Sequence, residues 1–161
     1  MLIREYTAED LSAIHALNEA GTPGVATASP GHLAEIANES CIALVAEIEG
    51  AVAAFCQVLP PRADYRSMNY AWFSERYDDF VYLDRIAVAP EHRGRGIGSR
   101  LYEEVERRAS APWFLLEVNI RPRNDGSLRF HARKGFVEVG QLETDYGARV
   151  SLMAKRFTAS R

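Results

Sequence analysis

Residues 88–99, VAPEHRGRGIGS, limit the fold of this chain more than any other segment. An apolar run typical of a strand ends at Pro90, glycines follow at positions 94, 96 and 98, and a stretch with helical spacing comes next. The first turn of a helix has N–H groups without partners and carries partial positive charge. Glycines there remove the Cβ atoms that would hold an anion away from those donors. The segment therefore predicts a strand–loop–helix unit whose loop cradles phosphate.

Two familiar phosphate loops do not fit this spacing. A Walker loop has glycine, four residues and then Gly-Lys-Ser/Thr, and the segment lacks that lysine. A dinucleotide-binding loop needs Gly-x-Gly-x-x-Gly, but Ser99 stands where the third glycine would follow Gly94 and Gly96. Arg93 and Arg95 add positive charge, and each guanidinium can hold a phosphate through two donors.

The apolar pattern predicts an α+β chain built around a mixed sheet, in the order β-α-α-β-β-loop-β-α-β-α-β-β. Strands are predicted at residues 2–6, 42–48, 51–58, 80–88, 114–118, 136–140 and 149–157. Helices are predicted at residues 7–20, 32–38, 98–109 and 127–134. Residues 1–161 are expected to form a single domain, because their number is typical of one domain and no repeat or linker divides them.

The connection at residues 59–79 is unusually long and carries five aromatic rings between charged residues. One interpretation is a short amphipathic helix that packs its rings on the sheet. The other is a lid facing the substrate, or a dimer surface, because Tyr and Trp are enriched at interfaces.

Composition excludes several classes of protein. An apolar fraction of 47% and a charged fraction of 25% are typical of folded globular chains and exclude a disordered one. The apolar runs are far shorter than the roughly 20 residues of a membrane span, and acidic residues near the N-terminus argue against a secretory signal, so we expect a cytoplasmic protein without membrane contact. A net charge of −3 argues against a nucleic-acid partner.

Cysteine and histidine are too sparse for a disulfide framework or a metal site. We expect Cys41 and Cys56 to be buried thiols that lie near each other across a hairpin turn at Glu49-Gly50. No metal is predicted.

Two spaced motifs carry a family resemblance. The first is RxxGxG at residues 93–98, entered from a strand that ends in IAVAP at residues 86–90. The second is NDGSLRFHARKGF at residues 124–136, in which Asn and a small residue precede an aromatic pair and a Gly-Phe. In this order, and with this succession of strands and helices, they resemble the GCN5-related N-acetyltransferases (the GNAT superfamily) over nearly the whole chain.

The resemblance implies a largely antiparallel mixed sheet flanked by helices, with acyl-CoA held where the strands at 80–88 and 114–118 splay apart. The loop would bind the pyrophosphate through backbone N–H groups, and the strand before it would pair with the pantetheine arm. Arg129, Arg133 or Lys134 would reach the 3′-phosphate. The coenzyme-binding residues that it implies are Ile86, Ala87, Val88, Arg93, Gly94, Arg95, Gly96, Ile97, Gly98, Ser99, Asn124, Ser127 and Phe130.

The implied reaction is direct transfer of an acetyl group from acetyl-CoA to a primary amine of a small molecule or a protein. An amine with a pKa of about 8–10 is mostly protonated at neutral pH, so a base is needed. Glu117 is a candidate because it lies on the strand opposite the coenzyme, where a Glu serves as base in ribosomal-protein N-terminal acetylating relatives. Asp84 is the other candidate, as base, as anchor for the substrate ammonium or as the partner of a helix arginine, with Arg85 on the other face of a regular strand.

The sequence departs from the family pattern in two places. His131 stands where the family most often has the tyrosine that protonates the leaving thiolate. An imidazole with a pKa of about 6.5 can donate that proton; alternatively His131 only packs or is exposed, and a thiolate with a pKa of about 8.5 leaves unaided. Arg121-Pro122 ahead of Asn124 predicts a longer link than usual between strand and helix.

Two functions follow from these expectations. The first is an acetyl-CoA-dependent N-acetyltransferase. The alternative is a non-catalytic acyl-CoA-binding or sensor module, which the missing tyrosine suggests. Because relatives frequently dimerise, a homodimer is compatible with both.

Overall fold

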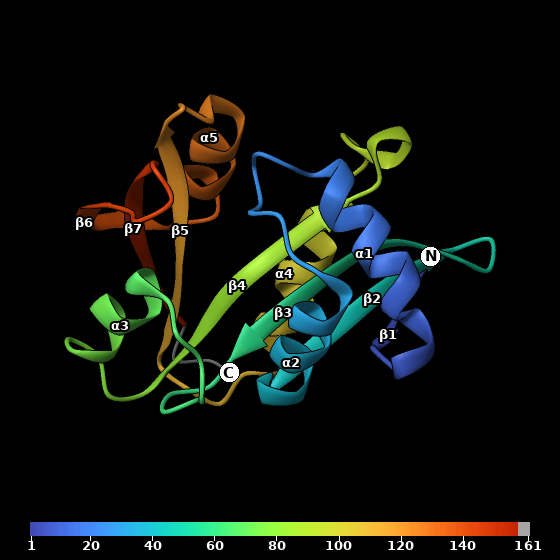
Figure 1. Ribbon diagram of the computed structural model, residues 1–161, viewed down its shortest axis with the longest axis horizontal. Coiled ribbons are helices and arrows are strands. Elements are labelled where there is room, and N and C mark those ends of the chain that lie inside the picture. The colour runs from blue at the N-terminus through green and yellow to red at the C-terminus, as the bar shows by residue number, and fades with distance from the viewer. Residues whose placement is uncertain (158–161) are drawn as a thin grey trace.

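The computed structural model describes residues 1–157, which form a seven-stranded sheet with helices on both faces (Figure 1). The strand order is β1-β2-β3-β4-β5-β7-β6. The strands are β1 (Leu2–Glu5), β2 (Ile42–Ile48), β3 (Ala51–Leu59), β4 (Phe80–Val88), β5 (Trp113–Arg121), β6 (Val137–Glu143) and β7 (Arg149–Arg156). The helices are α1 (Leu11–Ala20), α2 (Pro30–Glu39), α3 (Met68–Ser74), α4 (Ile97–Arg108) and α5 (Asp125–Arg133), with short 3-10 turns at Ala8–Asp10 and Pro90–His92.

The predicted α+β order is confirmed, and the main differences concern where elements end. β5 continues to Arg121, three residues beyond the predicted end. The link to α5 is therefore only residues 122–124, and the expectation of a long linker is wrong because strand pairing with β7 extends as far as Arg149. At the other end of the chain, the Thr7 N–H donates to the Asp10 carboxylate (2.8 Å) and so begins the first helical turn.

The strands β4 and β5 are the parallel pair, and they soon separate. Within residues 1–157 their pairing covers residues 80–82 of β4 and 113–115 of β5. Every other neighbouring pair in the sheet is antiparallel. Figure 1 shows β4 and β5 diverging from this point, with α5 beside β5 and α1 beside β4. The predicted splayed strand pair is thus present.

Side chains alternate between the two faces of the sheet and bury three apolar clusters. One face carries α4 and α5, where Leu101, Tyr102 and Phe114 lie at the centre of the largest cluster. The opposite face carries α1 and α2 over β2 and β3, and α3 over the start of β4 and β5. The cleft between β4 and β5 therefore has helices on both sides of it.

A β-bulge in β4 changes the direction of one predicted side chain. Gln57 of β3 pairs with Arg85, but Val58 pairs with Leu83, so Asp84 is an extra residue in β4. The bulge interrupts the alternation, and Asp84 and Arg85 form an ion pair at 2.8 Å. The expectation that Arg85 lies on the other face is therefore wrong, because the strand is not regular there.

The long connection at residues 59–79 contains α3 and confirms the first interpretation, a short helix with its rings on the sheet. Tyr70 and Phe73 are buried against Tyr82 of β4, with ring centroids 5.3 and 5.8 Å away. The Trp72 ring lies on Gly140 of β6, where a Cβ atom would come within 2.5 Å of it. Although α3 follows β3 in the chain, it therefore packs on the half of the sheet that contains β5, β7 and β6.

The burial predicted for the two cysteines is confirmed for Cys56 and wrong for Cys41. Cys56 is buried in β3, but Cys41 is exposed because it lies in the bend between α2 and β2. Cys56 pairs with Leu44, three residues along β2 from Cys41, so the two thiols are not opposed across the hairpin. Among the helices of the described part of the chain, none has the length and apolar character that a bilayer span requires.

Candidate active site

The glycine loop has the backbone geometry that an anion cradle requires. Gly94 and Gly96 have φ values of +78° and +79°, a region that residues with a Cβ rarely adopt. An added Cβ at either glycine would meet no atom within 4 Å, so the loop faces open space. α4 begins directly after Gly96, and its first helical hydrogen bond runs from the Arg100 N–H to the Gly96 carbonyl (3.1 Å). The N–H groups of the first turn are therefore left for a ligand.

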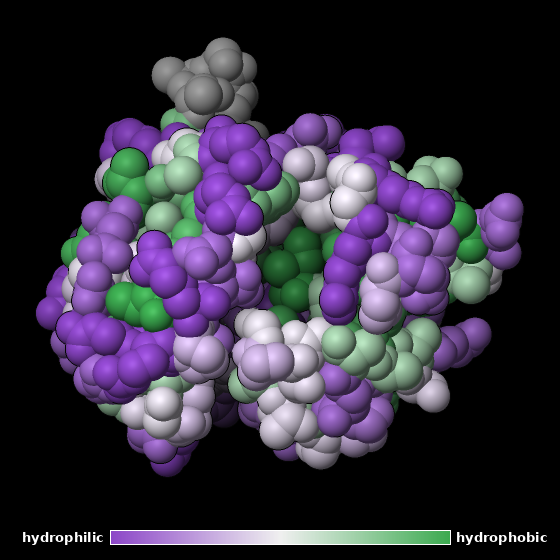
Figure 2. Space-filling model, turned by 90° about the horizontal axis from the view of Figure 1, so that it is seen from above, coloured by the Kyte–Doolittle hydropathy of each residue, from purple (hydrophilic) through white to green (hydrophobic). Residues whose placement is uncertain are grey.

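A pocket of about 390 Å³ brings this loop together with the end of β4 and with α5. It is lined by Val88, His92, Arg93, Gly94, Gly96, Ile97, Gly98, Ser99, Phe130 and Arg133. Seen from the end where β4 and β5 have separated, the molecule is hollowed between two lobes, with hydrophobic residues at the bottom of the hollow (Figure 2). A ligand with phosphates and an apolar arm fits these surroundings, because anionic groups meet the glycine loop and the arm meets an apolar floor.

Two residues expected to touch the ligand have structural partners. Arg93 donates to the backbone carbonyls of Val88 (3.2 Å) and Ala20 (3.3 Å), and so ties the loop to β4 and to the end of α1. Asn124 caps α5, where its Oδ1 accepts the Ser127 N–H at 3.2 Å. Arg95, in contrast, is exposed beside the loop.

Glu117 lies on β5 just beyond the last β4–β5 pair, on the face that carries α3. Its Oε1 accepts the hydroxyl of Tyr82, a β4 residue of that last pairing, at 2.6 Å. Part of the residue is exposed, but the protein surrounds the carboxyl group closely. This desolvation raises the pKa of Glu117 to about 8, and repulsion from Asp84 acts in the same direction. The hydrogen bond from Tyr82 favours the ionised form and partly opposes the increase. A carboxyl group with such a pKa can accept a proton near neutral pH.

The raised pKa makes the stability of the protein depend on pH. Because folding raises the pKa of Glu117 from 4.5 to about 8, the folded state holds an extra proton between these values and loses stability as the pH rises through that window. Glu117→Gln removes this loss while keeping the size of the side chain. We therefore expect the difference in unfolding temperature, variant minus wild type, to be larger at pH 9 than at pH 5. An equal difference at the two pH values would contradict the raised pKa.

Asp84 belongs to a buried network of hydrogen bonds and charge. Its carboxylate binds Arg85 and accepts the hydroxyl of Tyr65 from the long connection. Arg85 also donates to Asn18 Oδ1 of α1 (3.1 Å) and to the Ala26 carbonyl (3.3 Å). The expected partner, an arginine on a helix, is replaced by the adjacent residue because the bulge brings the two side chains together. The network joins β4 to α1 and to the connection after it.

His131 is buried between α4 and α5, with both ring nitrogens occupied. Nδ1 donates to the Ser127 carbonyl (2.7 Å), since a carbonyl only accepts, and Nε2 then accepts the Tyr102 hydroxyl (2.6 Å) in the neutral ring. Burial lowers the pKa of His131 below its usual 6.5, so the neutral form prevails at pH 7. The ring also contacts Phe130 and Phe136 edge-on.

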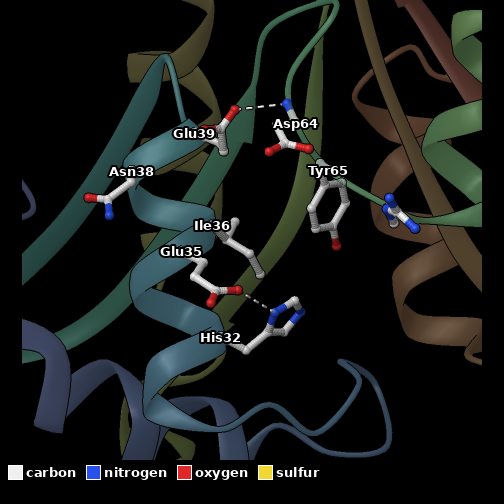
Figure 3. A pocket seen from close by; sticks show the side chains of 8 residues that line it. His32, Glu35, Ile36, Asn38, Glu39, Asp64 and Tyr65 are labelled. Atoms are coloured by element: carbon white, nitrogen blue, oxygen red, sulfur yellow. Dashed lines mark hydrogen bonds and ion pairs between the residues drawn. The ribbon is translucent and has the colours of Figure 1, made fainter.

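A second pocket of about 410 Å³ lies between α2 and residues 64–66 (Figure 3). Glu39 of α2 accepts the Asp64 N–H at 2.8 Å, and the His32 and Tyr65 rings stack with centroids 6.5 Å apart. These contacts hold the start of the long connection against α2. Tyr65 lines this pocket and also donates its hydroxyl to Asp84, so it links the pocket to the Asp84 network.

Several polar residues beside Glu117 were missed from the sequence. Asn69 of α3 favours the ionised form of Glu117, and the Tyr146 hydroxyl in the turn between β6 and β7 lies 3.4 Å from Asn69 Nδ2. Tyr82 carried a usable signal, because it precedes Asp84 by two residues on the same strand. The others come from segments far apart in the chain and had none.

The sequence and the fold agree on the family. The model of the acetyltransferase (GNAT) family matches residues 11–136. This covers most of the chain, including the glycine loop, β5 and α5. The chain belongs to the GNAT acetyltransferase family.

Three solved structures illustrate the similarity of fold. Ard1 from Thermoplasma volcanium has a TM-score of 0.79 at 18% identity, covering 98% of this chain and 97% of that one. The ribosomal-protein-S18-alanine N-acetyltransferase from Escherichia coli has a TM-score of 0.72 at 20% identity, covering 98% and 94%. The yncA protein from Salmonella typhimurium, solved with acetyl-CoA, has a TM-score of 0.70 at 20% identity, again covering 98% and 94%. At these identities the likeness is one of fold.

Proposed function

We propose that this protein transfers an acetyl group from acetyl-CoA directly to a primary amine of a small molecule or a protein. The observation that carries the proposal is the arrangement along β4 and β5: an open glycine loop at the end of β4, and the desolvated carboxyl group of the partly exposed Glu117 where the strands separate. Acetyl-CoA supplies the activated acyl group as a thioester. The yncA structure with acetyl-CoA supports this choice of donor.

On the donor side, residues 94–99 hold the pyrophosphate through their N–H groups. The backbone of Ile86, Ala87 and Val88 lies beyond the β4–β5 pairing and is paired to β3 on its other side, so it can take the pantetheine arm as an added strand. Phe130 and Arg133 close the pocket from α5.

On the acceptor side, Glu117 accepts the proton that the amine loses as its nitrogen bonds to the acyl carbon. Asp84 is bound to Arg85 and Tyr65, so its role is to hold β4 and the neighbouring connections in place and to raise the negative charge near the amine. When Glu117 is ionised, the two carboxylates and the single Arg85 leave a net negative charge that attracts a cationic acceptor. An acceptor that arrives as an ammonium ion first gives one proton to water, and the neutral amine then attacks and gives its second proton to Glu117.

His131 is proposed to be a structural residue, with the thiolate leaving unaided. Its Nε2 accepts a hydrogen bond and has no proton to give, and Nδ1–H is committed to Ser127. His131→Phe should therefore keep the rate of acetyl transfer within about threefold while it leaves the buried Tyr102 hydroxyl without its partner, at a cost of about 1–3 kcal/mol. Steady-state kinetics and thermal unfolding of the same preparation test this. A loss of kcat above about a hundredfold would instead assign the acid to His131.

The experiment that tests the function is incubation with acetyl-CoA and a panel of small amines and N-terminal peptides, read as release of free thiol. Turnover with at least one amine is expected. Tight coenzyme binding without turnover on any amine would favour an acyl-CoA-binding module. This second function is considered because His131, and not a tyrosine, stands at the position of the family's usual proton donor.

A further inference from the structure

Tyr82 of β4 is completely buried in the apolar cluster beneath α3. The rings of Tyr70 and Phe73 pack against it from α3, with centroids 5.3 and 5.8 Å away. On the β5 side, Tyr82 pairs with Leu115 in the last step of the β4–β5 ladder. Because its neighbours hold the ring closely, the hydroxyl group has a fixed position at the point where the two strands separate.

The Tyr82 hydroxyl has its partner on the other strand. Glu117 lies two residues beyond Leu115 on β5, and therefore on the same face of the sheet, and its Oε1 accepts the hydroxyl at 2.6 Å. A phenylalanine would fill the same apolar space without a hydroxyl group to desolvate. The contact with Glu117, and not packing, therefore accounts for a tyrosine at this position.

This hydrogen bond makes the two oxygens of Glu117 different. Oε1 can accept the hydroxyl whether the carboxyl group is ionised or protonated, because a protonated carboxyl group keeps a carbonyl oxygen that accepts. The proton of the protonated form then lies on Oε2. Glu117 is partly exposed, and Oε2 is not among the buried side-chain polar atoms of residues 1–157 that lack a hydrogen-bond partner. Oε2 is thus the oxygen that Tyr82 leaves for proton transfer.

We propose that Tyr82 is a positioning residue, whose hydroxyl holds Oε1 of Glu117 and thereby turns Oε2 toward the acceptor amine between the separated strands. The inference rests on the proposed function. In that reaction the amine nitrogen bonds to the acyl carbon, the amine proton passes to Oε2, and the C–S bond breaks with its electron pair leaving on the sulfur. Tyr82 is fully buried, so it acts through Glu117 and not on the reactants.

Other polar and titratable groups act on Glu117 from the elements packed around it. They are Asp84 and Arg85 of β4, Tyr65 of the long connection, Asn69 of α3, Tyr102 of α4 and Tyr146 of the turn between β6 and β7. Tyr82→Phe removes one hydroxyl group, changes no formal charge and leaves these groups in place. The effect of the variant can therefore be assigned to the hydrogen bond.

The test is the pH profile of kcat for Tyr82→Phe, measured by thiol release with an amine that the wild type acetylates. At the high-pH plateau, where Glu117 is ionised in both proteins, kcat should fall about 10–100-fold, the loss expected when a catalytic group is misplaced. The midpoint of the profile should move up, because the lost hydrogen bond favours the ionised form of Glu117. Coenzyme A affinity should be unchanged, since Tyr82 lies outside the loop pocket.

Tyr70→Phe is the matched control. It removes the hydroxyl of another buried tyrosine in the same cluster, whose partners are the Pro60 carbonyl and the Ala63 N–H, and it should leave the profile unchanged. In a Glu117→Gln background, Tyr82→Phe should have no further effect on kcat, because the carboxyl group through which it acts is gone. A wild-type plateau in Tyr82→Phe, or the same loss in both backgrounds, overturns the proposal.

A titration of the wild type serves if Tyr82→Phe does not fold. A ¹³Cζ label at Tyr82 in the free protein should respond to the ionisation of Glu117, with a midpoint at about 8. Because this titration requires no acceptor, a label that does not respond overturns the inference alone. A responsive label in a protein that acetylates no amine of the panel overturns the proposed function, and with it the role of Tyr82.

Discussion

Gly96→Val is expected to weaken coenzyme A binding by about a hundredfold or more, because about two charge-assisted hydrogen bonds would be lost at roughly tenfold each. Gly96 has a φ of +79°, which strains any residue with a Cβ, and its side-chain position opens onto the pocket. The valine would occupy the space of the phosphates and turn the N–H groups away from them. Calorimetric titration with coenzyme A measures the loss.

Gly50→Val is the matched control for this experiment. Gly50 has a φ of +80° and, like Gly96, has no atom within 4 Å of an added Cβ, but it lies in the hairpin turn between β2 and β3. Both variants carry the same backbone strain, so a loss of affinity confined to Gly96→Val is attributable to the loop. Coenzyme affinity in Gly96→Val equal to that of the wild type would disprove the cradle.

Glu117→Gln is expected to lower kcat by about 10²–10⁴-fold, the range that a general base contributes. The wild-type rate should rise with pH through about 8, because the carboxylate must be ionised and at pH 7 only about a tenth of it is. The variant should lose this pH dependence. Stopped assays of thiol release from pH 6 to pH 9.5, with saturating acetyl-CoA, give both results.

Coenzyme A affinity should remain unchanged in Glu117→Gln, since the residue lies outside the loop pocket. Glu143→Gln, at an exposed carboxylate on β6, is the control for a general effect of charge. Full activity in Glu117→Gln, or a wild-type rate independent of pH across 8, would show that another group or water removes the amine proton.

The fold and the glycine loop of the proposed donor side could be predicted from the sequence because their signals are local. Residues 88–99 contain a strand end, three glycines and a helix start within twelve positions, and the backbone itself forms the site. Apolar runs gave the strands β2 and β4 with their observed bounds. Where β5 ends depends instead on its pairing with β7, which local pattern does not report.

The acceptor side was less accessible because it is assembled from contacts distant in the chain. The bulge at Asp84 depends on the register with β3, and it reversed the expected direction of Arg85. His131 could be located by motif, but its partner Tyr102 lies 29 residues away on another helix. Asn69 belongs to a segment whose rings predicted packing, and only the crossing of α3 to the far half of the sheet brings its amide to the Tyr146 hydroxyl.

The position of α3 also means that the insert and the glycine loop can change independently of each other. The helix is inserted between β3 and β4, yet it rests against β6 through Trp72 and reaches the turn between β6 and β7 through Asn69. Under the proposed function, substitutions within this insert alter the surroundings of the incoming amine and leave the glycine loop untouched. In a lineage of such enzymes, the choice of acceptor can therefore diverge while the donor stays the same.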